Sequence, residues 1–524
     1  MLPQQPAAAA DKIAAPALAA DEIQQIGPGI YLSEIRSFEV ADTDVSAGSV
    51  GRRHSVVAPA SGGPAQPESA PASRADLGVF GPGWEAEFAG GSLSRKLEQQ
   101  SGAYVVTDLG VNEPVRYDFV SGAAFPDGGG VDKYRSADGS TVTETTKWDA
   151  AAGSLVTTVV EVLNANLSTT EEGDDTFTDA DGNPIPADDL KPTYTWKQAA
   201  PGSDPWRVTG VGSKANGTSS AGYDAQGRVT TIKEPAGADE PAESLTISYA
   251  PTTTAAGSVF GDFAGRAKAI TLTSGTTTQT VARYAYDASG LLRTVTNPVE
   301  SAEPSASYSY DTAGRLARTA SAANGAWNLD FSAGSAVPNV EATGPARPAS
   351  ESVIQGAPGI TDPNATAPPV SDFPGGETSD PQAYPRHCSA ATSWLWYTKS
   401  GCAAWAAHYG WRAPAWKQLP SRLWVVGIKY DHCTTSPDKP SGYDFRSACD
   451  MHDYGYGLIG NTYKGYRYYL DRSKKSNVDN AFHTTLRDYT CSAYRVKRLC
   501  RSIAYGYYQA VKKGGNPKNG ANRT

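Results

Sequence analysis

Short runs that alternate between hydrophobic and polar residues fill the middle of the chain. Between about Val79 and Val340, runs rich in Val, Thr, Ile, Leu and Tyr are separated by clusters of Gly, Pro, Asp and Asn, such as PDGGG at 126–130. A period of two is typical of β-strands with one buried face, and the Gly- and Pro-rich clusters mark turns. We therefore predict a β-rich, antiparallel region over residues 76–340. The clearest predicted strands are VTETTKW at 142–148, SLVTTVVEVL at 154–163, AKAITLTS at 267–274 and TQTVARYAY at 278–286.

A short motif recurs inside this region. Tyr-Asp, two variable residues and Gly begin at Tyr223, Tyr286 and Tyr310, and a β-prone run follows each copy. We predict that Tyr ends one strand, that Asp and Gly form the turn, and that the next strand follows. The stretch SYAPTTTAAG, from Ser248, is a candidate for a degenerate copy.

With these three copies, residues 75–335 resemble the YD-repeat, or Rhs-type, proteins of bacteria. The resemblance implies strands that wind into a shell or stalk, which carries a variable C-terminal domain that is often a toxin. An ordinary β-sandwich with Asp-Gly hairpins is the alternative interpretation of the same pattern.

The segments on either side of the β-rich region differ from it in composition. Residues 1–75 are rich in Ala, Pro, Ser and Gly and poor in aromatics, so we predict a mostly disordered leader. Nine prolines between 341 and 385 predict a Pro-rich linker over 341–383. Such a linker would let the C-terminal region, residues 384–524, act alone.

Charge is divided unevenly along the chain. Residues 384–524 hold 22 of the 46 Lys and Arg but only 8 of the 55 Asp and Glu, so they carry +14. The preceding 383 residues hold the other 24 and 47, so they carry −23, and the two parts together give −9. Such a division indicates two parts with different partners. Because no run approaches the ~18–20 apolar residues of a bilayer-spanning helix, we expect no membrane-spanning segment.

All six cysteines lie in the basic C-terminal region. This number in a short region indicates a disulfide framework, which forms in an oxidising compartment. Sequence alone allows 15 pairings, and free thiols or a zinc site are the alternative, although no CxxC is present. We therefore predict a secreted, extracellular protein; no signal peptide is visible, so we expect an upstream start or a processed chain. The spacing favours three local pairs: Cys388 with Cys402, Cys433 with Cys449, and Cys491 with Cys500.

The residues that suggest chemistry lie at 430–456. A Pro-, Ser- and Gly-rich loop is followed by a predicted helix in FRSACDMHDYGY, with Asp444 as a possible N-cap. On this helix His452 and Asp453 are adjacent, so their side chains point about 100° apart and serve different ligands in one cleft. His452 is a candidate general base. Immediately before the loop stand Asp431, His432 and Cys433.

A second carboxylate and a partner for the histidine complete the arrangement. A bridge between Cys433 and Cys449 would clamp the loop onto the helix and place Asp431 near Asp453. Two carboxylates with loop carbonyls are hard oxygen ligands that suit Ca²⁺. A general base needs a group that fixes its tautomer, and Asp479, in the next helical pattern NVDNAFHTTLRDY, is a candidate for this position.

Taken in order, these residues resemble the prokaryotic and fungal secreted phospholipases A2. The resemblance covers about residues 425–513 and implies an all-α, disulfide-stapled, phospholipase A2-like domain at 384–524. The predicted fold class is therefore multidomain: an all-β YD-repeat region, a Pro-rich linker and this domain. The matching residues are Asp431 and Cys433, then Ala448, Cys449, His452, Asp453, Gly455 and Tyr456, then Asp479, Ala481 and Phe482, then Cys491 and Cys500, and YYQAVK at 507–512.

The resemblance also implies roles for single residues. His452 would activate the water that attacks the sn-2 ester, and Asp479 would hold that histidine. Asp431 and Asp453 would bind Ca²⁺ through their carboxylates, and His432 would bind it through its backbone carbonyl. The ion would polarise the ester carbonyl and stabilise the developing oxyanion.

The sequence departs from the family in three places. The gap between His452 and Asp479 is longer than is usual, so we expect a longer loop around TYKGYRYYLDRSKK, and Asp471 is the alternative partner of the histidine. His432 stands where an apolar residue is common, which we expect to be tolerated because only its carbonyl would ligate. The first cysteine pair is additional to the two bridges of the family. We expect the remaining histidines of the region, His387, His408 and His483, to be surface or core residues.

Two functions compete at this point. The first is a secreted, calcium-dependent phospholipase A2 carried on a YD-repeat scaffold, as in a toxin effector. The second is a cell-surface scaffold or adhesin whose basic C-terminal module binds membranes without hydrolysis. Both have a phospholipid membrane surface as partner, and the charge of +14 favours anionic bilayers. We expect no nucleic acid as partner, although basic and aromatic residues coincide, and the sequence identifies no immunity protein.

Overall fold

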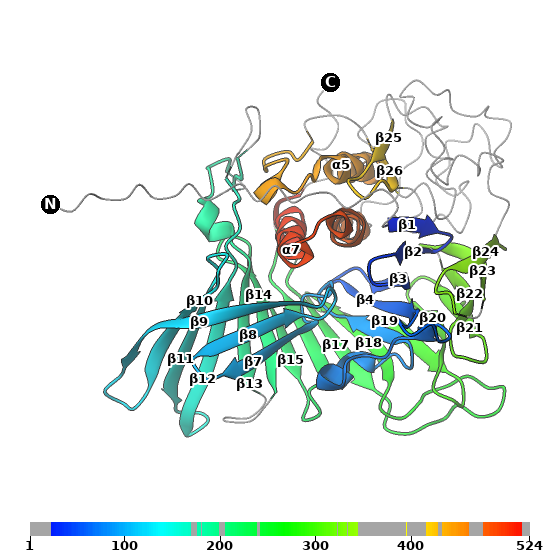
Figure 1. The fold of residues 1–524 in the computed structure, drawn as a ribbon, viewed down its shortest axis with the longest axis horizontal. Coiled ribbons are helices and arrows are strands. Elements are labelled where there is room, and N and C mark those ends of the chain that lie inside the picture. Colours follow the sequence, from blue (N-terminus) through cyan, green and yellow to red (C-terminus); the bar gives the residue numbers. More distant parts are fainter. Residues whose placement is uncertain are drawn as a thin grey trace.

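The structure is a computed structural model of the chain. It describes residues 23–168, 176–179, 181–198, 205–237, 241–321, 323–332, 334–343, 395, 415–427, 432–460 and 475–515. Within these ranges, a group of C-terminal helices lies on one side of a small N-terminal sheet and a long β-meander (Figure 1). The coarse prediction of a β-rich N-terminal part and a helical, disulfide-bonded C-terminal part is confirmed.

The N-terminal sheet contains strands that the composition of the first 75 residues did not predict. Its strands pair antiparallel in the order β1-β2-β3-β4-β5, and β6 also pairs with β4. The expectation of a mostly disordered leader is therefore wrong for residues 23–67. In β3 the residues Phe38 and Val40 are buried and Glu39 is not, so the strand signal was present but was diluted by the Ala- and Pro-rich residues around it. The strands are β1 (Ile23–Ile26), β2 (Gly29–Leu32), β3 (Ser37–Val45), β4 (Val50–Val57), β5 (Gln66–Pro67) and β6 (Trp84–Glu87), with the 3₁₀ turn η1 (Ala72–Gly78).

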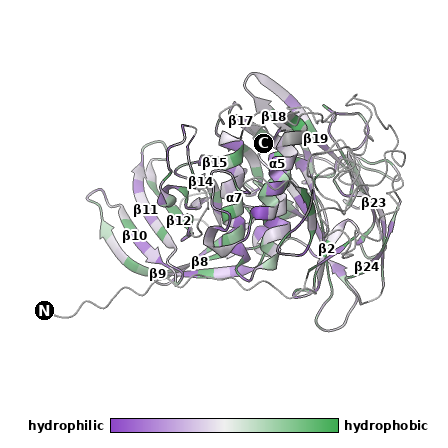
Figure 2. Ribbon diagram, turned by 90° about the horizontal axis from the view of Figure 1, so that it is seen from above, coloured by the Kyte–Doolittle hydropathy of each residue, from purple (hydrophilic) through white to green (hydrophobic). Residues whose placement is uncertain are grey.

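From Arg95 onward, the region predicted to be β-rich forms one antiparallel meander, in which each strand pairs with its neighbours along the chain. The four clearest predicted strands correspond to β11, β12, β18 and β19. The banded colouring of the strands in Figure 2 reflects the alternation on which the prediction rested. The strands are β7 (Arg95–Gln100), β8 (Ala103–Asp108), β9 (Glu113–Ala124), β10 (Gly130–Arg135), β11 (Thr141–Asp149), β12 (Ser154–Val162), β13 (Thr193–Gln198), β14 (Trp206–Ser213), β15 (Gly217–Tyr223), β16 (Val229–Glu234), β17 (Glu243–Tyr249), β18 (Ala267–Ser274), β19 (Thr277–Tyr286), β20 (Leu292–Thr296), β21 (Ala306–Tyr310), β22 (Leu316–Ser321), β23 (Gly325–Phe331) and β24 (Pro338–Ala342), with the turn η2 (Ala187–Leu190).

The three Tyr-Asp copies share one local geometry. Tyr223, Tyr286 and Tyr310 each end a strand, and each hydroxyl donates a hydrogen bond to a carbonyl of the preceding strand. In each copy the Asp carboxylate accepts hydrogen bonds from backbone N–H groups two and four residues ahead and pairs with an Arg of the following segment. The Gly residues have φ of +74°, +77° and +83°, where residues with a Cβ are strained. The degenerate copy keeps the tyrosine alone: Tyr249 ends β17 and donates to the carbonyl of Val229.

The C-terminal elements are mainly helical, as predicted, but they include a short hairpin that was not predicted. They are β25 (Ala415–Gln418), β26 (Trp424–Gly427), the 3₁₀ turn η7 (Pro440–Gly442), α5 (Arg446–Gly460), α6 (Lys475–Thr484), the π-helical turn η9 (Thr485–Thr490), the 3₁₀ turn η10 (Cys491–Ala493) and α7 (Lys497–Gly514). Among the described residues, no helix is both long and apolar enough to cross a membrane. The predicted linker was expected to begin at residue 341, but Glu341 and Ala342 belong to strand β24. Apart from Leu395, residues 344–414 lie outside the described residues.

The helices lie against the concave side of the β region. Seen from above, α5 and α7 lie between β8–β12 on one side and β19 and β23 on the other (Figure 2). Part of the contact is between opposite charges. The carboxylate of Glu113 accepts hydrogen bonds from the first two N–H groups of α7, at 2.9 and 3.1 Å, where the helix dipole favours negative charge. Further ion pairs join Arg498 to Glu161 and Asp138, Lys512 to Glu234 and Glu243, and Lys497 to Glu34.

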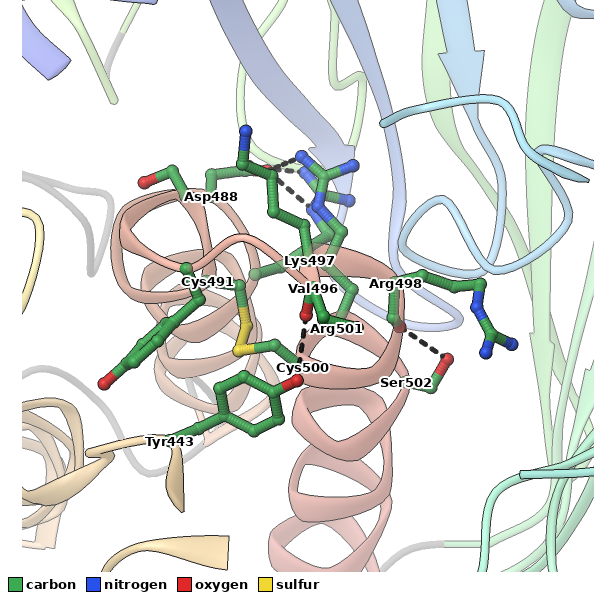
Figure 3. The surroundings of a disulfide bond; sticks show 12 residues. Tyr443, Asp488, Cys491, Val496, Lys497, Arg498, Cys500, Arg501 and Ser502 are labelled. Atoms are coloured by element: carbon green, nitrogen blue, oxygen red, sulfur yellow. Dashed lines mark hydrogen bonds and ion pairs between the residues drawn. A yellow bond between two sulfur atoms is a disulfide. The ribbon is translucent and has the colours of Figure 1, made fainter. Parts of the chain in front are cut away.

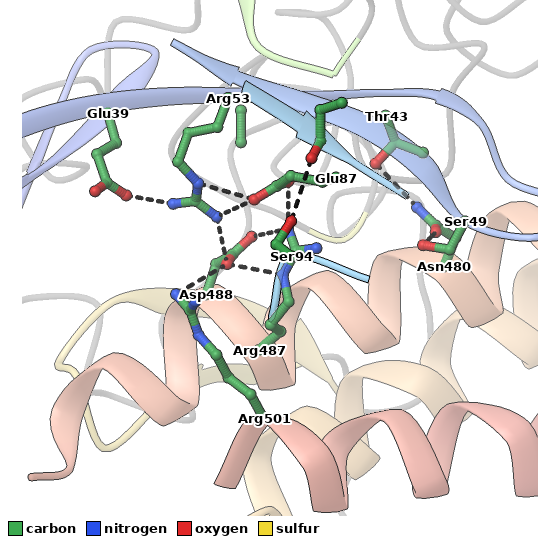
Figure 4. Close-up of polar contacts among 12 residues, drawn as sticks. Glu39, Thr43, Ser49, Arg53, Glu87, Ser94, Asn480, Arg487, Asp488 and Arg501 are labelled. Atoms are coloured by element: carbon green, nitrogen blue, oxygen red, sulfur yellow. Dashed lines mark hydrogen bonds and ion pairs between the residues drawn. The ribbon is translucent and has the colours of Figure 1, made fainter. Parts of the chain in front are cut away.

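A second charged cluster joins the N-terminal sheet to η9 (Figure 4). Arg53 of β4 lies 2.8 Å from Asp488, and Arg487 lies 2.8 Å from Glu87 of β6. Burial alone would raise the pKa of Asp488, but Arg487 and Arg53 more than offset this and hold the pKa of its carboxyl well below the usual value. Because such charges are costly to bury unpaired, the cluster ties the helices to the sheet in one arrangement.

His483 lies at the same boundary between the helices and the β region. It was expected to be a surface or a core residue, and it is buried. The ring stacks on Tyr508, with centroids 5.1 Å apart, and Gly90 of the β region leaves room for it, since a Cβ there would lie 2.1 Å from the imidazole. Burial lowers the pKa of His483 to about 3, and Arg487 adds to the effect. His54 is buried in the N-terminal sheet, and its pKa is likewise lowered to about 3.

We expect the protein to lose stability as the pH falls from about 6.5 toward 3. In this window the unfolded chain binds a proton at each buried histidine and the folded chain does not, so each should cost about 1.4 kcal/mol of unfolding free energy per pH unit. Urea unfolding at pH 6, 5 and 4 measures the slope. In the His483→Gln variant the unfolding free energy should change less steeply with pH, by about 1.4 kcal/mol per pH unit, which is the contribution of one histidine. An identical slope in the variant and the unsubstituted protein would contradict the assignment.

Candidate active site

Helix α5 has one face that packs in the core and another that carries the candidate site residues. Ala448, Met451 and Tyr454 are fully buried and form its apolar side. The strand β26 packs so closely that a Cβ on Gly427 would lie 2.8 Å from the main chain of Asp450. Cys449, His452, Asp453 and Tyr456 follow one another at intervals of three, one and three residues, so they share another side of the helix.

The structure brings His452 and Asp479 together. Imidazole Nε2 lies 2.9 Å from the Asp479 carboxylate, and both side chains are buried. Because this carboxylate accepts the Nε2–H, the other nitrogen, Nδ1, is the one left to accept a proton. The ring is fixed in orientation by two aromatic neighbours, Tyr456 at 4.1 Å and Phe482 at 4.7 Å between centroids.

Asp479 has two further partners that the sequence did not predict. The Tyr456 hydroxyl donates to Oδ1 at 2.6 Å, and the Lys475 ammonium donates to Oδ2 at 2.7 Å. Burial alone would raise the pKa of Asp479, but the hydrogen bond from His452 and the charge of Lys475 outweigh it and lower the pKa below the ordinary value. The carboxylate is therefore ionised and available to stabilise an imidazolium. The predicted helix begins at Asn477 and leaves Lys475 in the expected loop, whereas α6 begins at Lys475 and places it four residues before Asp479.

The loop before α5 is held against the helix by a disulfide. Cys433 is bonded to Cys449, as the spacing favoured, and its N–H donates to the Asp438 carboxylate at 3.0 Å. The preceding residue, His432, has a left-handed backbone with φ of +59°. Asp431, the first expected calcium ligand, lies outside the described residues, as does Asp471, the alternative partner of the histidine.

The second bridge joins Cys491 of η10 to Cys500 of α7, again as favoured by the spacing (Figure 3). It fixes the turn between the helix that carries Asp479 and the last helix. Lys475 donates to the carbonyls of Val511 and Lys512 near the end of α7, which links the two helices at the other end. The expected pair of Cys388 and Cys402 lies outside the described residues.

Carboxylate and carbonyl oxygens near α5 are chemically suited to bind a hard cation. In the described part of the chain, no cluster of three or more His, Cys, Asp or Glu side chains is placed to hold a metal ion. The disulfide nevertheless places the backbone of His432 beside the helix that carries Asp453, so a carbonyl and a carboxylate come from adjacent segments. Carboxylate and carbonyl oxygens are the donors that Ca²⁺ prefers.

Comparison with known proteins points to one family for this part of the chain. Residues 411–515 match the family model described as prokaryotic phospholipase A2. This range contains α5, the disulfide-held loop, α6 and α7. The C-terminal region is thus similar to phospholipase A2, and the resemblance to YD-repeat proteins remains an interpretation of the sequence.

A curated relative supports the same family. The chain is 40% identical over 91 residues to the protein named "Secretory phospholipase A2" of Arthroderma benhamiae. The matched stretch is 16% of this chain and 57% of the relative, so the chain spans little more than half of the relative's length.

Proposed function

We propose that the C-terminal region is a calcium-dependent phospholipase A2 that hydrolyses the sn-2 ester of glycerophospholipids. The observation that carries the proposal is the buried hydrogen bond of 2.9 Å between His452 and Asp479, on helices that match the phospholipase A2 family. The placement of this pair beside the disulfide-held loop at Cys433 supports it further.

The pair is suited to general-base catalysis. Asp479 accepts the Nε2–H of His452, which fixes the tautomer and leaves Nδ1 to take a proton from an attacking water. As the water adds to the ester carbonyl, the imidazole becomes positively charged, and the ionised Asp479 stabilises it. Lys475 and Tyr456 keep the carboxylate in place, and the aromatic side chains at the ring limit access of bulk water. The same imidazolium then protonates the departing lysophospholipid alkoxide.

The residues expected to hold calcium are Asp431 and Asp453, through carboxylates, and His432, through its carbonyl. Bound there, the ion would supply Lewis-acid polarisation of the ester carbonyl and charge stabilisation of the oxyanion.

The setting of the activity is part of the proposal. The disulfides and the secretory relative support a secreted, extracellular protein. The substrate surface would be a phospholipid membrane. Anionic bilayers would be preferred because they attract the basic residues that remain exposed. The β region would serve as a YD-repeat scaffold in the manner of a toxin effector, for which an immunity protein would be a further partner.

A positional lipid assay tests the function. The full chain, with its disulfides intact, is given phosphatidylcholine labelled in the sn-2 acyl chain, with Ca²⁺ or with EGTA. We expect labelled free fatty acid and unlabelled lysophospholipid with Ca²⁺, and no release with EGTA. Vesicle binding without release in either condition would contradict the proposal and favour a scaffold or adhesin with a membrane-binding module. Release from the sn-1 position would contradict the assigned specificity.

A further inference from the structure

Three segments meet at one buried carboxylate on α5. Asp450 is 1% exposed, and each of its oxygens has a partner from a different segment. Oδ1 lies 2.8 Å from Nδ1 of His432 in the loop, and Oδ2 lies 3.0 Å from the ammonium of Lys417 in β25. Because the carboxylate accepts, Nδ1 of His432 carries the proton. Lys417 supplies the positive charge that a buried carboxylate needs.

The partner in the loop has an unfavourable backbone conformation. His432 has φ of +59°, in the left-handed region that residues with a Cβ rarely adopt. A conformation of this kind persists only where the surroundings determine it. Two attachments do so here: the ring of His432 is bonded to Asp450, and the next residue, Cys433, is bonded to Cys449. Neighbouring residues of the loop are thus fixed to neighbouring residues of α5.

These attachments bear on the oxygen donors of the proposed calcium site. Asp453 follows Cys449 by one helical turn, so its carboxylate lies on the side of α5 to which the loop is attached. The direction of the His432 carbonyl depends on the backbone at residue 432. This carbonyl also accepts a hydrogen bond from the N–H of Thr434 at 3.1 Å. The contact between His432 and Asp450 holds the residue that bears the carbonyl against the helix that carries Asp453.

We propose that Asp450 is a positioning residue, which through the ring of His432 holds the loop carbonyl in the orientation for binding a divalent cation beside Asp453. The inference rests on the proposed function and goes beyond it, because it assigns a task to two side chains that would not themselves touch the ion. The proposal also explains why residue 432 is polar, although only its backbone carbonyl was expected to bind the ion.

Calcium affinity of the full chain tests the proposal independently of turnover. His432→Leu removes the ring donor, and Asp450→Asn removes the charge that the donor recognises. We expect each to raise the calorimetric Kd for Ca²⁺ at least ~10-fold, which corresponds to about 1.4 kcal/mol. The double variant should bind about as weakly as the weaker single variant, since both changes break one contact.

A rescue variant separates positioning from packing. The side-chain nitrogen of asparagine stands at the same number of bonds from the backbone as Nδ1 of histidine, and asparagine adopts the left-handed region readily. His432→Asn should therefore keep the Kd within about threefold of the unsubstituted chain. Asp444→Asn is the matched control, because it alters an ion pair with Arg446 at the start of the same helix and should leave the Kd unchanged. Melting temperatures in EGTA check that each variant is folded.

The outcomes distinguish this inference from the proposed function. Calcium binding that depends on Asp453, as measured with Asp453→Asn, but is the same in the His432→Leu and Asp450→Asn chains would overturn the inference alone. Additive losses in the double variant would also overturn it. Absence of any Asp453-dependent binding in the unsubstituted chain would contradict both the inference and the proposed metal site.

Discussion

The His452→Ala variant of the full chain is expected to release fatty acid at least ~10³-fold more slowly than the unsubstituted protein. Its imidazole is the group whose Nδ1 is left to accept a proton, because Nε2 is bonded to Asp479 at 2.9 Å. Loss of a positioned general base typically costs 10²–10⁴ in rate, and the loss of the imidazolium adds to it. Initial rates on sn-2-labelled phosphatidylcholine with saturating Ca²⁺ measure the effect.

Two comparisons make this result specific. Asp479→Asn keeps the shape of the partner and should be milder than His452→Ala, since a hydrogen bond to the ring remains possible. The control is His54→Gln, which alters a buried histidine in the N-terminal sheet and should keep the rate within about threefold in the folded protein. A His452→Ala chain that is folded and retains near-normal rates would refute the assigned role.

The second large effect is expected at the proposed metal site. Asp431→Ala and Asp453→Asn should each lower turnover at least ~10³-fold, and EGTA should abolish it, because no other cationic group in the proposed mechanism would neutralise the oxyanion. Readdition of Ca²⁺ should restore the rate of the unsubstituted chain but not of the two variants at the same concentration. Undiminished hydrolysis in EGTA would show that the reaction proceeds without the metal.

The local features of the fold were predictable from short stretches of sequence. The turn at Asp287 needs only a carboxylate, a glycine three residues later and flanking β-prone runs, all within one segment, and it forms as predicted. Likewise, the meeting of His452 with Asp479 follows from two amphipathic helices that pack together. The Ala- and Pro-rich composition of residues 1–75 masks the alternation in residues 23–67, so the strands there are not predicted from composition.

Contacts between distant segments could not be predicted in the same way. Arg498 pairs with Glu161, 337 residues earlier in the chain, and no local pattern relates the two. The division of charge between the two parts is visible in the sequence, but it does not show whether the partners of the charged groups are external or lie within the chain. The structure shows that Arg498 and Lys512 meet carboxylates of the β region, so part of the basic charge is paired within the chain. The attraction to an anionic bilayer stays a prediction for the remaining exposed charges.

The proposed mechanism requires one imidazole and one cation that face the same ester. The most direct measurement is a crystal structure of the full chain with Ca²⁺ and a phospholipid analogue that has an amide in place of the sn-2 ester. We predict an ion whose ligands include Asp453 and the His432 carbonyl, with metal–oxygen distances of about 2.3–2.6 Å. We also predict that Nδ1 of His452 points toward the amide and lies within hydrogen-bond reach of a water molecule. An ion bound elsewhere, or a His452 ring with Nδ1 turned away from the bound analogue, would contradict the account.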